Sequence, residues 1–306
     1  MLRKRPIRLR MSGALILSIA FQWTLFAGQG RTIGDIMLDH VKKIEYQNEI
    51  GRRQFIKDKL KEFGVSFSVM GFDTVMFYNG KTSDMKGENI IVSYGDAKNK
   101  IVVGAHLDAI FGMPGANDNG SGVAVLLELI HDLQYRHFHH RIDLCFFDLE
   151  EPGLIGSSIY VRRFDANYTL TGMINLDVEG SGDEIYVGPT AGEHHAILLK
   201  YIHQAKDETK FPYYEDQIFP ETDNESFGDA DLENISISVV PGGDGKRISD
   251  FYRIPPAGKQ KMEKYPLILK IMHTKDDTSA LVEPKSLEMA YSFAMKTLLL
   301  LDDGEK

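Results

Sequence analysis

Cysteine is almost absent from the sequence, with Cys145 the single one among 306 residues. One cysteine excludes an intrachain disulfide and any metal site built from several thiolates. Cys145 lies in the apolar run DLCFF, which favours a buried and unreactive thiol. Stability must therefore come from a hydrophobic core, and a chain with 43% hydrophobic residues can form one large core.

Basic residues are also scarce once the N-terminus is set aside. Five of the 35 lysines and arginines, and none of the 44 acidic residues, lie in residues 1–30, so residues 31–306 carry a formal net charge of -14. Such an acidic body is a poor partner for a phosphate backbone. We therefore expect no nucleic-acid partner.

Residues 1–30 have the pattern of a secretory signal peptide: a basic segment, then an uncharged stretch that contains the only tryptophan, Trp23, and ends in small residues. About 20 uncharged residues can also span a bilayer, so a membrane anchor through residues 11–30 is the alternative. Polar residues dilute the stretch and favour cleavage. We expect an exported protein, periplasmic or secreted, without stable membrane insertion once the signal is removed. Residues 31–306 are then a single domain, whose oligomeric state the sequence leaves open.

Hydrophobic periodicity over residues 33–64 predicts one or two amphipathic helices, and residues 121–133 predict another. Between and after them lie short apolar runs that we interpret as strands, the first two separated by a polar turn at 79–89. These runs are 65–72, 88–94, 100–106, 141–151, 171–176 and 266–272. The alternation predicts a mostly parallel sheet with helices on both faces.

Four of these runs end in side chains that can bind metal. The side chains at these ends are His106, Glu150 with Glu151, Asp177 and His273. In open α/β sheets the ligand crevice lies beyond the carboxyl ends of the strands, so the four ends can converge. Asp118 follows in a glycine-rich loop, where a tight backbone can bring it close to His106.

The nitrogen and oxygen ligands of this set suit Zn²⁺ without a thiolate. A carboxylate that bridges two ions would give a two-metal site with a shared activated water. Five ligands and a spare glutamate meet that requirement, so the sequence predicts a two-metal site of this kind.

The same residues lie in motifs whose order and separation resemble the M28 family of co-catalytic zinc aminopeptidases. The motifs, spread over about residues 50 to 300, are GAHLD, PGANDNGSGVAVLLEL, FFDLEEPGLIGS, INLDVEG and MHTKDDTSALV. The resemblance implies a three-layer α/β/α sandwich around a mixed, mostly parallel sheet of about eight strands. It also implies two zinc ions per chain and a peptide substrate.

Carried over residue by residue, the resemblance assigns every member of the set a role. His106 and Asp177 would hold one zinc, Glu151 and His273 the other, and Asp118 would bridge them. Glu150 would be the general base. Asp108 would orient His106, and their spacing of two residues in an extended chain agrees, because both side chains then point the same way.

One motif departs from the family. Where members often carry Ser-Asp-His and then a hydrophobic residue, this chain has TDNESF, in which Asp223 and Phe227 fit and Asn224 does not. Asp223 and Phe227 are therefore candidates for substrate binding. Ile218 and Phe219 are further candidates for the pocket wall.

The predicted function is hydrolysis of the N-terminal residue of peptides. The first alternative is a glutaminyl cyclase of the same fold. Cyclases carry a tryptophan before the final histidine, where this chain has Met272, and an insertion that the short link from Glu151 to Ser157 lacks. The second alternative is a non-catalytic binding domain. Loss of a metal ligand or of the base would indicate it, and none of these residues is missing. The sequence leaves the preferred side chain open, as well as the choice between amino-acid and dipeptide release.

Overall fold

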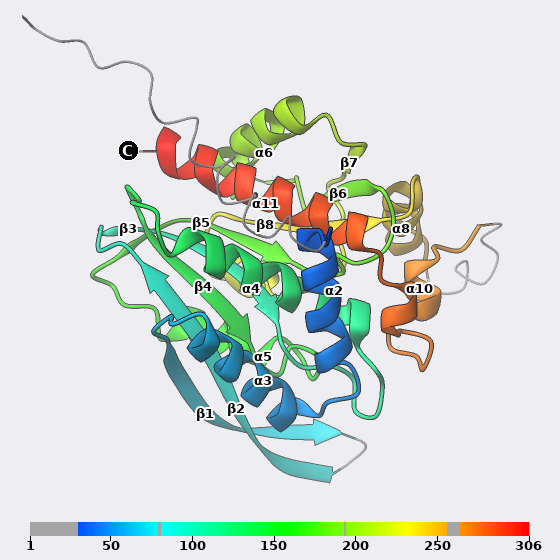
Figure 1. The fold of residues 1–306 in the computed structure, drawn as a ribbon. Coiled ribbons are helices and arrows are strands. Elements are labelled where there is room, and N and C mark those ends of the chain that lie inside the picture. The colour runs from blue at the N-terminus through cyan, green and yellow to red at the C-terminus, as the bar shows by residue number, and fades with distance from the viewer. Residues whose placement is uncertain (1–29, 79–80, 193, 256–263, 306) are drawn as a thin grey trace, which may run out of the picture.

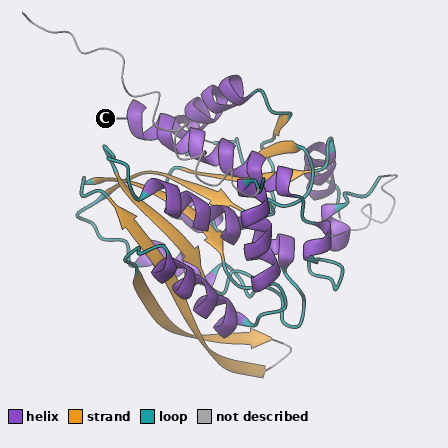
Figure 2. Ribbon diagram, viewed as in Figure 1, coloured by secondary structure: helices purple, strands orange, loops and turns teal. Residues whose placement is uncertain are grey.

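The computed structural model describes residues 30–78, 81–192, 194–255 and 264–305, so the predicted signal peptide lies outside the described residues apart from Gly30. One mixed eight-stranded sheet crosses the molecule, with helices packed against it (Figures 1 and 2). This architecture confirms the predicted α/β sandwich.

The sheet has the strand order β1-β2-β4-β3-β5-β8-β6-β7. Its four central strands, β4, β3, β5 and β8, are mutually parallel, while β1 with β2, β2 with β4 and β8 with β6 pair antiparallel. The strands are β1 (Ser68–Tyr78), β2 (Lys81–Tyr94), β3 (Asn99–His106), β4 (Arg141–Phe147), β5 (Thr169–Leu176), β6 (Glu184–Gly188), β7 (Tyr213–Glu215) and β8 (Asn234–Val240). The parallel centre brings several carboxyl ends to one edge of the sheet.

Local sequence signals mark the starts of the first and the last of the described helices. Thr32 forms a capping box with Asp35 at the start of the first of them, and Pro284 begins the last. The longer helices are α2 (Ile33–Ile44), α3 (Glu49–Glu62), α4 (Gly122–Leu133), α5 (Ile155–Arg162), α6 (Ala196–Thr209), α8 (Asp244–Arg253) and α11 (Pro284–Gly304). Short helices are η1 (Ala116–Ser121), α7 (Glu225–Gly228), α10 (Ile268–Ile271) and η2 (Ser279–Leu281).

The core divides along the two faces of the sheet, because alternate residues of a strand point to opposite sides. On β3, Ile101 and Val103 belong to the main core, to which α2, α3, α4, α6 and α11 contribute. Val102 points to the other face and joins a smaller cluster with Tyr160 of α5 and Phe227 of α7. Both faces of the central strands are therefore covered.

Two sequence predictions about local structure are wrong. Residues 83–87 lie within β2, where they pair with β1, and so the predicted polar turn at 79–89 is largely strand. The apolar run 266–272 contains the short helix α10 and is no strand of the sheet. Its apolar residues instead pack beside Val178, Tyr186, Val240 and Ile248 in a third cluster.

Candidate metal centre

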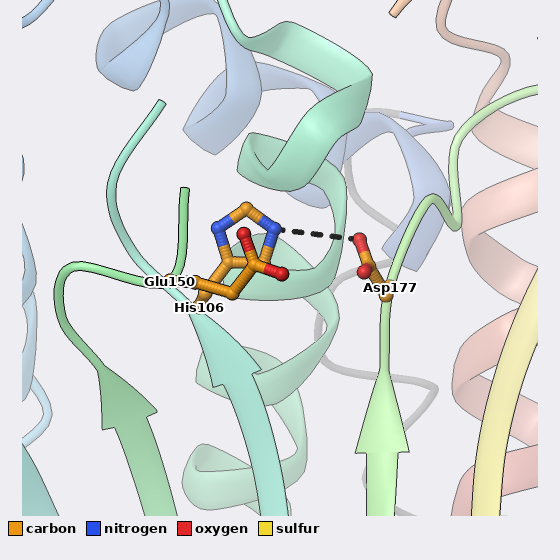
Figure 3. A group of neighbouring side chains, drawn as sticks. All are labelled: His106, Glu150 and Asp177. Atoms are coloured by element: carbon orange, nitrogen blue, oxygen red, sulfur yellow. Dashed lines mark ion pairs between the residues drawn. The ribbon is translucent and has the colours of Figure 1, made fainter. Parts of the chain in front are cut away.

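The predicted metal ligands and the predicted base, Glu150, meet beyond the carboxyl ends of the central strands. His106 is the last residue of β3, Asp177 follows β5 directly, and Glu150 lies in the turn after β4. Figure 3 shows these three side chains directed into one space above the three strands. Only 1% of the His106 side chain is exposed, so its ring belongs to the interior of the site.

Asp118 lies between the two histidines. Its Oδ1 is 3.1 Å from Nε2 of His106, and its Oδ2 is 3.0 Å from Nε2 of His273. On either side, Oδ1 of Asp177 lies 3.5 Å from Nε2 of His106, and Oε2 of Glu151 lies 3.2 Å from Nε2 of His273. One carboxylate thus faces both halves of the set, as a bridging ligand would.

The ligand atoms form two groups that suit metal ions. In one, atoms of His106, Glu150 and Asp177 all lie within 4.8 Å of one another, and in the other the same holds for Asp118, Glu151 and His273. The buried oxygens Asp118 Oδ2 and Asp177 Oδ1 accept no hydrogen bond, although each faces a histidine nitrogen. Unbonded buried carboxylate oxygens beside imidazoles fit divalent cations with nitrogen and oxygen ligands.

The loop that carries Asp118 is held from both sides by groups that sequence reasoning missed. Asp277 accepts hydrogen bonds from the backbone N–H of Asn117 at 2.8 Å and of Asp118 at 3.1 Å. All three residues of this contact lie in sequence motifs, but only the fold reveals that the segment after His273 supports the segment before α4.

Arg52 of α3 holds the other side of the same loop. Its fully buried guanidinium donates to the carbonyl oxygens of Leu107, Pro114 and Gly115 at 3.3, 2.8 and 2.9 Å. Gly115 has φ +58°, and a Cβ there would lie 2.5 Å from Nη2 of Arg52, so glycine is required. Burial lowers the pKa of Arg52, and nearby carboxylates led by Asp108 oppose that change.

Asp108 supports the turn that carries the two glutamates. Its Oδ1 accepts the N–H of Glu150 at 3.0 Å, and its Oδ2 accepts the N–H of Glu151 at 3.1 Å. The same carboxylate lies 3.6 Å from Nδ1 of His106, so it touches the residue it was predicted to orient. Glu151 is held again by the N–H of Ile110, which donates to its Oε1 at 3.2 Å.

Thr222, which sequence reasoning did not select, lies directly against Asp177. Its hydroxyl donates to Oδ2 of Asp177 at 2.6 Å and accepts a hydrogen bond from Nδ2 of Asn175 at 3.1 Å. The sequence feature that could have identified Thr222 is its position in TDNESF, where members of the family often have serine. The hydroxyl, and not the acidic neighbour, is the group of this motif that touches a predicted ligand.

Asp223 and Phe227 are not among the residues that line the cavity beside the metal centre, and their contact with substrate stays a prediction. Phe227 is fully buried, with its ring 6.3 Å from Phe147 and 6.0 Å from Tyr160. Asp223 is also fully buried, and burial raises its pKa to about 7. Apolar packing thus explains the position of Phe227, whereas both carboxylate oxygens of Asp223 are buried without a hydrogen-bond partner.

Burial and mutual charge perturb the titration of the site's own groups. Burial lowers the pKa of His106, but carboxylates led by Glu150 and Asp177 outweigh it and raise that pKa well above its usual value. Burial raises the pKa of Glu150 well above its usual range; His106 opposes this, and the carboxylate of Asp223 adds to it. Perturbed groups gathered in a cavity are typical of catalytic sites.

A cavity of about 260 Å³ opens beside these residues. Part of its wall is formed by the predicted metal ligands and Glu150. The rest of the wall is mainly apolar, with the side chains Leu154, Val178, Tyr186, Phe219, Pro220, Val240, Ile248, Ile268, Leu269 and Met272. Phe219 therefore lines the cavity as predicted, whereas Ile218 does not.

Known proteins resemble this chain in sequence and fold. A probable lipoprotein aminopeptidase of Mycobacterium tuberculosis (LpqL) is 30% identical over 170 residues, which are 52% of this chain and 34% of that protein. The chain thus spans about a third of this relative's length. A zinc aminopeptidase structure from Bacillus subtilis has a TM-score of 0.68 at 13% identity, covering 87% of this chain and 93% of that one.

A glutaminyl cyclase structure from Porphyromonas gingivalis has a TM-score of 0.63 at 20% identity, covering 90% of this chain and 96% of that one. These structural likenesses establish the fold and leave the reaction open. The sequence profile of Peptidase family M28 matches residues 89–298, which include every predicted metal ligand. The chain belongs to Peptidase family M28.

Proposed function

We propose that this chain is a zinc-dependent aminopeptidase that hydrolyses the N-terminal residue of peptides and holds two zinc ions. The observation that carries the proposal is the position of Asp118, whose two oxygens face His106 and His273 at the wall of an open cavity. Membership of Peptidase family M28 supports the reaction class. An aminopeptidase among the relatives agrees with it.

Zinc, when bound, supplies hydroxide near neutral pH and polarises the scissile carbonyl. The residues that would hold the two ions are His106, Asp177, Asp118, Glu151 and His273. Glu150 would accept the proton of the attacking water and pass it to the leaving amine. Asp108 would keep Glu150 in place, because it accepts the N–H of that residue.

The apolar part of the cavity wall supports a preference for a hydrophobic N-terminal residue. Val240, Ile248 and Ile268 are almost fully buried and line the cavity together with the predicted ligands. A leucine-sized side chain would remove this surface from water, at about 25 cal/mol per Å² of apolar area. We therefore propose leucine, methionine or phenylalanine as the released residue.

Glutaminyl cyclase remains the second candidate, because structures with that activity share the fold. Two features of this chain argue against it. Met272 lines the cavity immediately before His273, and the only tryptophan, Trp23, lies outside the described residues and the M28 match. A cyclase would be expected to enclose an N-terminal glutamine with aromatic side chains at that place.

A panel of aminoacyl p-nitroanilides, together with a peptide that begins with glutamine, tests the reaction. We expect the zinc-loaded protein to release p-nitroaniline fastest from leucyl, methionyl and phenylalanyl substrates and to leave the glutaminyl peptide uncyclised. Formation of pyroglutamate without release of amino acids would overturn the proposal in favour of the cyclase. An N-acetylated leucyl substrate is the control, because an aminopeptidase requires the free amine.

We further propose that residues 1–30 are a signal peptide, removed on export to leave residues 31–306 as one peptidase domain. No helix among the described residues is long and apolar enough to cross a membrane. The intact mass of the exported protein should correspond to a chain that begins near residues 28–31. The protein should also show no tryptophan fluorescence, because Trp23 is lost. A mass that retains residues 1–27 would indicate a membrane anchor instead.

A further inference from the structure

Two consecutive arginines of α3 contact different parts of the site. Arg52 binds the loop that carries Asp118, whereas Arg53 reaches the turn after β4. Nε of Arg53 lies 2.6 Å from Oδ2 of the fully buried Asp148, and its Nη2 donates to the carbonyl oxygen of Lys86 at 2.8 Å. Arg53 lies outside the part of the chain that matches Peptidase family M28. The family's motifs therefore do not explain its ion pair with Asp148.

Asp148 connects Arg53 to the turn. Its carboxylate accepts the N–H of Glu88 on β2 at 2.7 Å and the N–H of Leu149 at 3.0 Å. Its own N–H donates to Oδ1 of Asn89 at 3.0 Å. Burial raises the pKa of Asp148 to about 6, and the positive charge of Arg53 opposes that rise. Arg53 therefore favours the ionised carboxylate, which can accept from both N–H groups.

Leu149, which lies between Asp148 and Glu150, has a backbone conformation that leucine rarely adopts. Its φ is +58°, in the left-handed region. Such a conformation persists only where surrounding contacts hold it. Here the N–H of Leu149 donates to Asp148, and its carbonyl oxygen accepts the N–H of Ile155 at 2.9 Å. Asp148 thus helps to fix the residue that directs the chain into Glu150.

The two glutamates after Leu149 depend on this turn to different degrees. The carboxylate of Glu151 has contacts of its own, because it accepts the N–H of Ile110 at 3.2 Å and lies 3.2 Å from Nε2 of His273. No hydrogen bond to the carboxylate of Glu150 is present within the part of the chain that the structure describes. The direction of the Glu150 side chain in Figure 3 therefore depends on its backbone.

We propose that Arg53 is a positioning residue, which acts through Asp148 and the turn at Leu149 to hold Glu150 where it can accept the proton of the attacking water. This role rests on the proposed function, in which Glu150 is the general base. Neither Arg53 nor Asp148 is among the residues that line the cavity. A displacement of about 1 Å from the reacting geometry can lower a rate about 100-fold, so loss of the ion pair should lower kcat.

Substitutions of this pair test the role on the zinc-loaded protein, with leucine p-nitroanilide as substrate. We expect Arg53→Met to lower kcat about 10- to 100-fold, with KM changed less than about 3-fold and bound zinc unchanged. Arg53→Lys keeps a cation beside Asp148 and should recover most of the loss. Asp148→Asn leaves no buried charge unpaired, so it should lower kcat in the same way even where Arg53→Met fails to fold.

Lys57→Met is the matched control. Lys57 lies about one turn further along α3 and forms an ion pair with Glu88 of β2, so its loss also loosens the contact between α3 and β2. We expect its kcat to stay within about 2-fold of the wild-type value. A fall in kcat as large as that of Arg53→Met would overturn the positioning role, because a loosened helix would then explain both.

A double variant distinguishes positioning of the base from a general effect on the site. If Arg53 acts through Glu150, Arg53→Met should lower kcat no further in the Glu150→Gln protein, where the base is already absent. Losses that multiply in the double variant, or unchanged kcat in both Arg53→Met and Asp148→Asn, would overturn the role of Arg53 and leave the aminopeptidase proposal intact. A zinc-loaded wild-type protein that hydrolyses no substrate would overturn the proposed function, and this role with it.

Discussion

The hydroxyl of Thr222 lies 2.6 Å from Oδ2 of Asp177 and donates a hydrogen bond to it. The amide of Asn175 donates to the same hydroxyl oxygen at 3.1 Å, which directs the hydroxyl proton toward the carboxylate. The other oxygen of Asp177 faces His106. Thr222 thus fixes which oxygen of Asp177 is available to a metal ion.

Replacing this hydroxyl should weaken metal binding. Thr222→Val keeps the shape of the side chain but leaves Oδ2 of Asp177 without its donor, so we expect zinc affinity to fall about 10- to 100-fold. Thr222→Ser retains the hydroxyl and should stay within a few-fold of the wild-type affinity. Competition of each protein with a chromogenic zinc chelator measures the effect, and equal affinities for the valine and serine variants would contradict it.

The two adjacent glutamates should respond differently to the same substitution. Glu150→Gln should retain the bound zinc and lower kcat by about 10²- to 10⁴-fold with little change in KM, because it removes the positioned base. Glu151→Gln should lose zinc as well as activity, since a neutral amide is a poorer ligand. Metal content and kcat of both variants decide the roles. Loss of zinc from Glu150→Gln alone would reverse the assignment, and near-normal turnover by Glu150→Gln would exclude it as the base.

Arg52 should contribute to stability even without metal. Arg52→Met removes the guanidinium hydrogen bonds to the carbonyl oxygens of Leu107, Pro114 and Gly115, and we expect a loss of about 3 kcal/mol in the free energy of unfolding. Arg52→Lys should recover part of this loss, because one ammonium can donate to some of the three oxygens. Urea unfolding in the presence of chelator measures the effect.

The exposed Arg136 provides the control for that comparison. Arg136→Met should change the free energy of unfolding by no more than about 0.5 kcal/mol. If Arg52→Met were as stable as Arg136→Met, the guanidinium would not be what holds the loop.

The strands that position the site were predictable because each is a short apolar run bounded by turn signals. Residues 100–106, 141–151 and 171–176 all contain strands of the parallel centre, and the residues after them converge as the topology requires. The run 266–272 has the same apolar character, yet it forms α10, since a short apolar run alone does not distinguish a strand from a buried helix. His273 still reaches the site, but from a loop and not from a strand end.

The supporting residues were harder to predict, because their partners are remote in sequence. Arg52 bonds to residues more than 50 positions away, and Asp277 to residues about 160 positions away. Phe227 fitted the family motif but faces apolar rings, and nothing in the sequence distinguishes a buried aromatic residue from one that lines a pocket. Sequence motifs therefore predicted the chemical groups of the site, and the fold revealed what holds them.

The most direct test of the account is a zinc titration of the chelated mature protein, with metal content and hydrolysis of leucine p-nitroanilide measured at each step. Chelation should abolish hydrolysis, zinc should restore it, and about two ions should be bound per chain at saturation. Full activity in a metal-free preparation, or full activity with one ion bound, would contradict the bridged two-zinc centre around Asp118.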